Sequence, residues 1–435
     1  MRLRRWVCGP RVLGKCGGVL VLTVALYCLL NVDHIEGWWM SGGVWGGALS
    51  AEARTRALAS LRQEQEALSA QLEDFYLLAN ERFCTPTAPF LLSLVTSAPP
   101  NDAARHAIRQ TWGSVTNVGG RAVRTLFLLG NPDSPAQRQA LASEAEQHGD
   151  IVQGNFRDSY ANLTLKTLSL LRWTARYCPR AAFITKVDDD VLLNYKVLLP
   201  YLERLAMGED GEGLGNHKDK GEGEWGETVA DGSRVGEEKG GKSKEKGEER
   251  GEWEGEWSRG WSGQWADWRG SWFSGPDLYL GRVHRGVVPT RDPQSKSFVS
   301  YQVYPQDRFP QYCSGTAYVL SSSAARKLYL ASYLTPRCPL EDVFVGLSAQ
   351  GAGLRPSHCS LFSGGPHIPF QRCCYSALIS AHHVTAAQQH QYWGELRGGP
   401  HCSWIIGRAA FGVCKLRALL GTMLPWLRDT STGLQ

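Results

Sequence analysis

The stretch AAFITKVDDDVLLN, Ala181 to Asn194, decides the fold class of this 435-residue chain. A short apolar run leads into three successive carboxylates, Asp188, Asp189 and Asp190, and a second apolar run follows them. The first run has the length and composition of a buried strand. In open α/β sheets, ligands gather at the carboxyl ends of the strands. Because three adjacent negative charges repel one another, the stretch predicts a strand that ends at a cation or ligand site.

Strand patterns alternate with helix patterns around this stretch, from Pro89 onward. FLLSLVTSA and VRTLFLLG are apolar strands, and NDAARHAIRQTWG is a helix that opens with a capping residue. PAQRQALASEAEQHG is a helix with proline near its start and glycine after its end. TLKTLSLLRWTARYC is a third helix, and SGTAYVLSSSAARKLYLAS is a strand followed by a helix. This alternation predicts the α/β class with a largely parallel sheet.

The N-terminal 32 residues predict a membrane anchor. Residues 1–15 are rich in arginine, and residues 16–32, CGGVLVLTVALYCLLNV, carry no charge. The apolar run is close to the roughly 20 residues that span a bilayer, and the basic flank should stay in the cytoplasm. A cleaved signal peptide is the alternative, but no small-x-small cleavage site follows the run directly. We therefore expect a cytoplasmic tail (1–15) and a transmembrane signal-anchor (16–32), with the bulk of the chain in the lumen.

Residues 33–83 are expected to form a lumenal stem. Within it Leu58, Leu61, Gln65, Leu68 and Leu72 are spaced alternately three and four apart, which is a short coiled-coil seam broken by one glutamine. A homodimer through the stem and a solitary amphipathic helix both fit this spacing. The catalytic domain is expected over 84–435, with an insertion at 208–275 whose Gly, Glu and Lys content predicts disorder. The alternative to disorder is that the recurring tryptophans of the insertion form a patch that binds membrane or sugar.

Cysteine usage and charge narrow the class of protein. The net charge of +5 without a basic stripe argues against a nucleic-acid partner. The cysteines do not form two C-x-x-C pairs, so a zinc site is not expected. In a lumenal domain they predict disulfides, whose connectivity the sequence does not give. Their number beyond the anchor is odd, so at least one thiol is free or pairs between chains. Asn162 begins the glycosylation acceptor NLT.

Two acidic constellations carry the predicted chemistry. Asp188 and Asp190 form a D-x-D pair, and such carboxylates suit Mn²⁺ or Mg²⁺, which bridges phosphate oxygens and neutralises a diphosphate leaving group. Acidic turns without a metal are common on surfaces, so the placement after a buried strand is what favours a metal. In LEDVFVG, Glu341 and Asp342 precede an apolar helix. From spacing alone, the safer interpretation is that both carboxylates favour the helix dipole at the start of the helix. The functional interpretation is that one of them is a general base, which deprotonates a sugar hydroxyl.

Six motifs in order resemble the β1,3-galactosyl/N-acetylglucosaminyl transferases of family 31. They are RHAIRQTWG, RTLFLLG, DSYANLTLKTL, FITKVDDDVLLN, YCSGTAYVLS and EDVFVG, and they extend from Pro89 toward the C-terminus without the insertion. The resemblance implies a GT-A fold, with a Rossmann-like mixed sheet and helices on both faces. It also implies UDP-galactose as donor, Mn²⁺ and an inverting single displacement. LYLGRVH, PLEDVFVGLSA and RCCY followed by CSW resemble members that add galactose to the terminal N-acetylgalactosamine of gangliosides.

The resemblance also implies roles for single residues. Asp188 and Asp190 match the metal-binding D-x-D, with Asp190 as the usual direct ligand, and Asp342 matches the catalytic base. Arg105 and Arg109 match a segment near the nucleotide, where a guanidinium can meet phosphate. The remaining motif positions with a nucleotide-side role are Lys166, Lys186 and Asp189.

A further metal-binding histidine is implied eleven residues before a tryptophan, in a pattern like H-x-x-S/T/D-P. SAHHVTAAQQHQYW offers His382 and His383. His382 has the right distance to Trp393 and has Thr385 at the expected place, although the proline is missing. Counting from Cys374 favours His383 instead. We expect His382 to be the ligand and keep His383 as the alternative.

The N-terminal pattern predicts a single-pass type II membrane protein, and the resemblance implies an enzyme of the Golgi membrane that transfers galactose from UDP-galactose to a glycolipid (ganglioside) acceptor. A β1,3-N-acetylglucosaminyltransferase is the alternative, because the shared motifs do not separate donor sugars. A non-catalytic, membrane-anchored glycan-binding protein is a third hypothesis, against which the intact acidic positions argue. The sequence leaves the acceptor glycan, the oligomeric state and the role of the insertion open.

Overall fold

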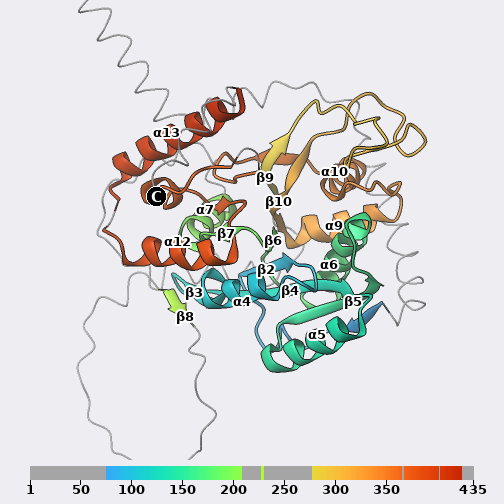
Figure 1. The fold of residues 1–435 in the computed structure, drawn as a ribbon, viewed down its shortest axis with the longest axis horizontal. Helices are drawn as coiled ribbons and strands as arrows, with labels where there is room; N and C mark the ends of the chain where they lie inside the picture. Colours follow the sequence, from blue (N-terminus) through green and yellow to red (C-terminus); the bar gives the residue numbers. More distant parts are fainter. Residues whose placement is uncertain (1–74, 208–226, 230–276, 365–366, 401, 424–435) are drawn as a thin grey trace, which may run out of the picture.

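The computed structural model describes residues 75–207, 227–229, 277–364, 367–400 and 402–423 (Figure 1). The predicted tail, the predicted anchor, nearly all of the stem and most of the insertion lie outside the described residues. Within the described ranges, no helix is both long and apolar enough to cross a membrane.

A mixed sheet forms the centre of the described structure. Its strands in spatial order are β1 (Tyr76–Leu78), β5 (Ile151–Arg157), β4 (Arg121–Asn131), β2 (Leu91–Thr96), β6 (Phe183–Asp188), β10 (Tyr312–Ser321), β9 (Tyr279–His284) and β11 (Pro356–His358). The run β5-β4-β2-β6 is parallel, as the strand–helix alternation predicts. β10 runs antiparallel to both β6 and β9, so the sheet is mixed rather than largely parallel beyond β6.

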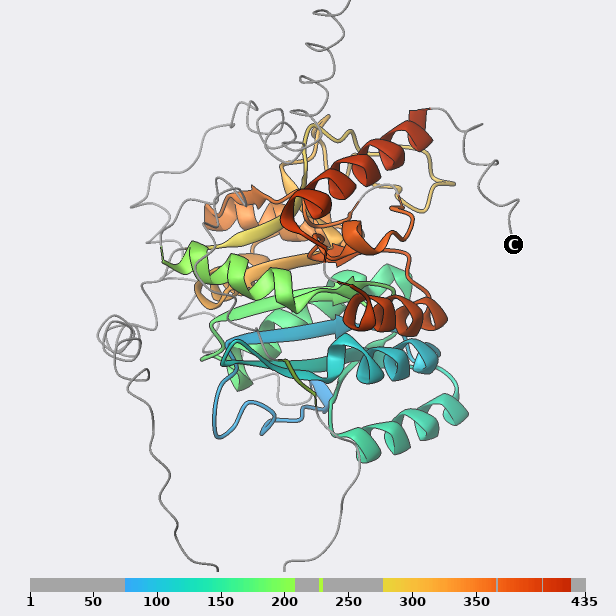
Figure 2. The same cartoon turned by 90° about the vertical axis from the view of Figure 1, so that its left-hand side faces the viewer.

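Helices cover both faces of this sheet, which confirms the α/β class (Figures 1 and 2). They are α4 (Asp102–Gln110), α5 (Pro135–His148), α6 (Leu163–Tyr177), α7 (Tyr195–Ala206), α9 (Ser322–Ser332), α10 (Glu341–Ala352), α11 (Arg372–Tyr375), α12 (Ala386–Gly398) and α13 (Trp404–Met423), with short 3₁₀ turns at Trp112–Ser114 and Tyr160–Asn162. In β2, Leu91 and Val95 enter one hydrophobic cluster and Leu92 and Leu94 enter the other. A strand buried on both faces has no polar alternation, which is why FLLSLV is apolar except for the buried Ser93.

Short strand pairings join segments that are distant in sequence. β7 (Leu192–Leu193) pairs antiparallel with β12 (Ser380–Ala381) and so brings the end of the Asp triplet beside His382. β3 (Val115–Val118) pairs with β4 and with β8 (Glu227–Val229). β8 belongs to the range predicted as a disordered insertion, and that prediction is corrected for these three residues, because β3 supplies their backbone partners.

Two disulfides are formed within the part of the chain that the structure describes, Cys84–Cys178 and Cys373–Cys402. The first joins the segment before β2 to the residue that follows α6, and the second joins α11 to the segment before α13. The predicted use of disulfides is thereby confirmed. The free cysteines among the described residues are all buried: Cys313, Cys338, Cys359, Cys374 and Cys414.

Candidate active site

A cavity of about 800 Å³ opens at the carboxyl ends of β2 and β6. Its walls come from the loops after β2 and β5, the start of α6, the middle of β10 and the first turn of α10. Most of the predicted site residues line it, namely Lys166, Lys186, Asp188, Asp189, Asp190, Asp342 and His382. Arg105, Arg109 and His383 do not belong to its lining.

The first two carboxylates of the triplet are held by the end of the neighbouring strand. β2 and β6 are parallel with Thr96 opposite Asp188, so the residues that follow each strand lie side by side. Thr96 Oγ1 donates to Asp188 Oδ1 at 2.8 Å, and Ser97 Oγ donates to Asp189 Oδ2 at 2.6 Å. Asn101, expected as a helix cap, makes no cap hydrogen bond and donates to Asp189 Oδ2 at 2.9 Å. Burial raises the pKa of Asp189, and these hydrogen bonds oppose the rise.

The buried Lys186 supplies the counter-charge that three adjacent carboxylates need. Its Nζ lies 2.7 Å from Asp188 Oδ1 and 3.7 Å from Glu341 Oε2, and it also donates to the carbonyl of Gly315. Burial alone would lower the pKa of this ammonium, but the charges of Asp188 and Glu341 outweigh burial and raise it. Lys186 therefore stays charged and joins the strand end of β6 to the first turn of α10.

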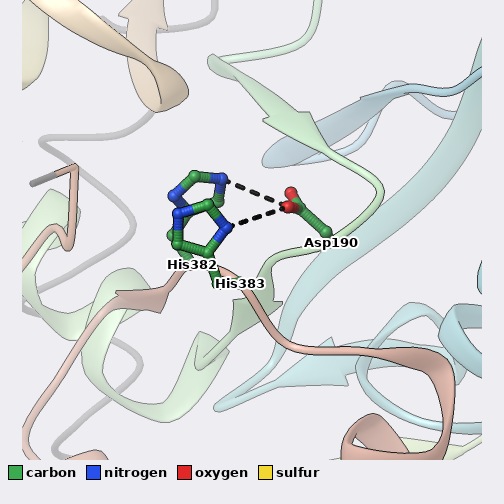
Figure 3. Close-up of side chains that lie close together, drawn as sticks. All are labelled: Asp190, His382 and His383. Atoms are coloured by element: carbon green, nitrogen blue, oxygen red, sulfur yellow. Dashed lines mark ion pairs between the residues drawn. The ribbon is translucent and has the colours of Figure 1, made fainter. Parts of the chain in front are cut away.

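Asp190 faces two histidines across the β7–β12 pairing (Figure 3). His382 Nε2 lies 3.2 Å and His383 Nδ1 lies 3.7 Å from Asp190 Oδ2, and the two imidazole rings stack with centroids 3.7 Å apart. The backbone of His383 is left-handed, at φ 62°, a conformation that costs free energy for a side chain of this kind. One ligand atom from each of the three residues lies within 4.8 Å of the others. Asp188 does not enter this cluster, because Thr96 and Lys186 hold its Oδ1.

The electrostatics of this cluster suit a divalent metal ion. Burial alone would raise the pKa of Asp190, but the hydrogen bond and charge of His382, with the charge of His383, outweigh it and lower the pKa. Burial and the charge of His382 lower the pKa of His383, which favours the neutral imidazole that binds a metal. A carboxylate oxygen with two imidazole nitrogens is a donor set that manganese and its neighbours accept.

The Glu341–Asp342 pair begins α10, and the two carboxyl groups differ in their partners. Glu341 is buried and accepts from Thr167 Oγ1 at 2.9 Å and from Tyr318 Oη at 3.0 Å. Asp342 lines the cavity, and its Oδ1 accepts from the backbone N–H of Val343 at 2.8 Å. Burial raises the pKa of both carboxyl groups. A raised pKa makes Asp342 a stronger proton acceptor, while its place in the first turn also suits the helix dipole.

Gly315 leaves the room that these two carboxyl groups occupy. A Cβ at this position would lie 2.8 Å from Glu341 Oε2 and 3.4 Å from Asp342 Cβ. Gly315 also supplies the carbonyl that accepts from Lys186. Any side chain at position 315 would therefore displace Glu341 and disturb the environment of Asp342.

The structure does not bring Arg105 and Arg109 to the carboxylates of the cavity. Arg105 is buried, and all five of its N–H groups are engaged with Glu144, Ser97 Oγ and the carbonyls of Ala98 and Pro99. This pairing leaves Arg105 no donor for a phosphate. In this structure Arg105 fixes the loop that holds Asp189, and the expected nucleotide contact stays a prediction.

The other basic residues have structural partners of their own. Arg109 makes a two-pronged contact with Asp150, at 2.8 and 2.9 Å, and donates to Glu144 at 2.8 Å. The buried Lys166 lies at the cavity wall and donates to the carbonyl of Ser97 at 2.6 Å and to Asp158 at 3.0 Å.

Asn162 stands directly before α6 and makes no side-chain cap hydrogen bond with that helix. Its Nδ2 donates to the carbonyl of Arg157 at 2.9 Å, and the hydroxyl of Thr164 in the same acceptor motif is buried against the carbonyl of Cys338. Glycosylation at Asn162 stays a prediction.

Sequence reasoning missed the residues that orient the triplet, Thr96, Ser97 and Asn101. The signal was present in SLVTSAPPN, since polar side chains directly after a buried strand share the edge where β6 ends. The structural role of Glu341 was also missed, because its partners come from α6 and β10.

Comparison with known proteins defines the class. The galactosyltransferase family model matches residues 103–215 and 274–360. The chain is 39% identical over 345 residues to β1,3-galactosyltransferase 4 of Mus musculus, covering 76% of this chain and 81% of that one. It is 38% identical over 362 residues to the human protein of the same name, covering 79% and 84%. The chain belongs to the galactosyltransferase family, which confirms the resemblance, and it is a hexosyltransferase.

Other matches extend the comparison. Human β1,3-galactosyltransferase 9 is 32% identical over 392 residues, covering 90% of this chain and 88% of that one. Among solved structures, the galactosyltransferase LgtC in complex with donor and acceptor sugar analogs covers 71% of this chain and 98% of its own. The TM-score of this match is 0.28, at 10% sequence identity.

Proposed function

We propose that the protein is an inverting β1,3-galactosyltransferase that moves galactose from UDP-galactose to the terminal N-acetylgalactosamine of a ganglioside. Membership of the galactosyltransferase family supports a nucleotide-sugar donor and a glycoconjugate acceptor. The observation that carries the proposal is one cavity lined both by Asp190 with His382 and by Asp342.

Asp190 and His382, with His383 beside them, are the residues that would hold Mn²⁺. Their oxygen and nitrogen donors fit such an ion, and they meet within the span of one coordination sphere. A divalent ion bound there would neutralise the negative charge that develops on the diphosphate leaving group. Asp188 contributes through Lys186, whose position it fixes.

Asp342 acts as the general base of the transfer. Its Oδ2 takes the proton of the acceptor 3-hydroxyl, because Oδ1 already accepts from Val343 N–H. The hydroxyl oxygen then bonds to the anomeric carbon of galactose from the face opposite the diphosphate, and the bond between that carbon and the diphosphate oxygen breaks. Displacement from the opposite face converts an α-linked donor into a β product. The charge of Lys186 favours the deprotonated form of Asp342, and the backbone N–H of Val343 holds its Oδ1.

The finer organisation of the protein belongs to the same proposal. We assign a GT-A arrangement to the mixed sheet, with the donor at the carboxyl ends of β2 and β6. We assign the chain to the Golgi membrane as a type II protein anchored by residues 16–32, with a stem over 33–83 that forms a homodimer. The basic flank before the apolar run and the disulfides support a lumenal catalytic domain.

A donor and acceptor panel tests the proposal. The purified full chain is incubated with Mn²⁺ and either UDP-galactose or UDP-N-acetylglucosamine, against ganglioside, neutral glycolipid and glycoprotein acceptors. We expect galactose transfer to a ganglioside with terminal N-acetylgalactosamine, lost in EDTA and restored by Mn²⁺. Transfer of N-acetylglucosamine alone would replace the donor assignment, and binding of glycans without transfer would indicate a non-catalytic protein.

A further inference from the structure

α13 presents apolar side chains on two of its faces. Phe411, Cys414 and Ala418 enter the hydrophobic core, where α13 lies against α11. On the outer side, the exposed fractions are 63% for Ile405, 56% for Ile406, 37% for Val413 and 46% for Leu416. Figures 1 and 2 both show α13 along the outer edge of the molecule.

These exposed residues form one face rather than a scatter. At about 100° per residue, Ile405, Ile406, Val413 and Leu416 fall within an arc of about 100°, on the side away from Phe411 and Cys414. A helix on the surface of a water-soluble domain usually turns polar residues outward. A contiguous exposed apolar face marks an interaction site.

The charges of α13 indicate the kind of partner. The helix carries Arg408, Lys415 and Arg417 and no acidic residue. By the same helical spacing, the exposed Arg417 borders one side of the apolar arc and the half-buried Lys415 borders the other. Arg408 is buried and lies over the ring of Phe411, so it does not belong to this border. An apolar arc between basic residues is typical of helices that lie in the plane of a membrane surface, where the cations meet anionic headgroups.

We propose that the outer face of α13, formed by Ile405, Ile406, Val413 and Leu416, docks on an anionic lipid bilayer. A second copy of the chain is disfavoured as the occupant, because pairing this face with itself brings the same positive charges together. The inference deepens the proposed function and rests on it in one respect: a glycolipid acceptor presents its sugar at the bilayer surface, where the enzyme must reach it.

Docking of α13 has a direct structural route to the active site. The Cys373–Cys402 disulfide ties the segment before α13 to α11, and α11 also contacts α12. α12 begins at Ala386, directly after the segment that carries His382 and His383. Fixing α13 on a bilayer therefore fixes the orientation of the cavity relative to the plane in which a glycolipid acceptor lies.

Photo-crosslinking tests the docking without reference to activity. The full chain is placed in nanodiscs of phosphatidylcholine with phosphatidylserine, and p-benzoylphenylalanine replaces Val413 or, as control, Leu77. Leu77 is 50% exposed on β1, which lies away from α13 in Figure 1. We expect lipid adducts at position 413 to exceed those at 77 by about tenfold, and to decrease without phosphatidylserine. Equal adducts at both positions, or crosslinks from 413 to a second copy, would overturn the proposal.

A substitution pair then measures the consequence for transfer. Val413→Asp with Leu416→Asp is compared with Leu77→Asp, on a ganglioside embedded in the nanodisc and on a water-soluble oligosaccharide with the same terminal sugars. We expect the double variant to lose about tenfold on the embedded acceptor and to match the unsubstituted chain on the soluble one. An unchanged ratio of the two rates would count against docking. If the unsubstituted chain uses neither acceptor, the proposed function fails, and the crosslinking result alone decides the docking.

Discussion

Asp190 and Asp342 line the same cavity, yet the protein moves their pKa values in opposite directions. Burial raises the pKa of both carboxyl groups, and at Asp190 two imidazoles reverse the effect. At Asp342 the hydrogen bond from Val343 and the charge of Lys186 only reduce the rise. Neighbours, not residue type, therefore shift the pKa values of two aspartates in opposite directions, which suits the proposed cation ligand at Asp190 and the proposed proton acceptor at Asp342.

Removing the proton acceptor is expected to have the largest effect. Asp342→Asn keeps the size of the side chain and its place in the first turn of α10 but cannot take a proton. We expect turnover to fall by about 10²–10⁴-fold, the range that general base catalysis contributes, with UDP binding unchanged. Turnover by donor consumption and UDP binding by calorimetry are measured on the same protein. Near-normal turnover would remove Asp342 from its role.

The histidine pair tests the other half of the comparison. His382 is nearer to Asp190 and less exposed than His383, with side-chain exposures of 16% and 58%. We expect His382→Ala to weaken Mn²⁺ binding by about 100-fold or more and His383→Ala by about tenfold, since even residues that only support a metal ligand contribute about 10–100-fold. Electron paramagnetic resonance titration of Mn²⁺ gives both affinities without an activity assay. The reverse order would make His383 the principal ligand.

Substitution of Arg105, with Arg109 as its control, tests whether the loop after β2 affects binding of the UDP-sugar donor. Arg105 and Arg109 both bind Glu144, but Arg105 also holds the carbonyls of Ala98 and Pro99. Lysine cannot reproduce this fork of donors. We expect Arg105→Lys to raise the KM for the UDP-sugar by about tenfold with kcat little changed, and Arg109→Lys to leave KM unchanged. Thermal unfolding of both variants controls for stability. Equal KM values for the two variants would show that the contacts of Arg105 with the loop do not affect donor binding.

The smallest expected effect is a shift in pH dependence. Because the pKa of Asp342 is raised by burial, activity should fall with acid at a pH above the ordinary aspartate value of about 3.9. The positive charge of Lys186 lowers the pKa of Asp342, so Lys186→Met should move this acid limb to higher pH. The pH profile of kcat/KM for the variant and the unsubstituted chain gives the shift. A limb that moves to lower pH would contradict the charge assignment.

Local patterns predicted the elements, and long-range contacts decided how the site is built. The helix α5 begins with Pro135 and ends before Gly149 at φ 63°, as its sequence predicts. The position of the two histidines depends instead on the two-residue pairing of β7 with β12, segments that no periodicity connects. The partners of Arg105 lie on a loop and on α5, so a motif position could not reveal that this guanidinium binds Glu144 and the carbonyl of Ala98. Six ordered motifs indicated the family, while only the structure shows that Asp188 lies outside the group of Asp190, His382 and His383.

The disulfide Cys84–Cys178 also has a mechanical meaning. Tension applied to the chain on the N-terminal side of residue 84 would first peel β1 from the sheet edge at β5, where hydrogen bonds break one after another. At Cys84 the load passes through a covalent bond to Cys178, the residue that follows α6. The strand β2, which ends at Thr96, and the strand β6, which ends at the Asp triplet, lie beyond that bond. Force on the N-terminal segment therefore passes through the disulfide to the end of α6 and not to the edge of the sheet where β2 and β6 end.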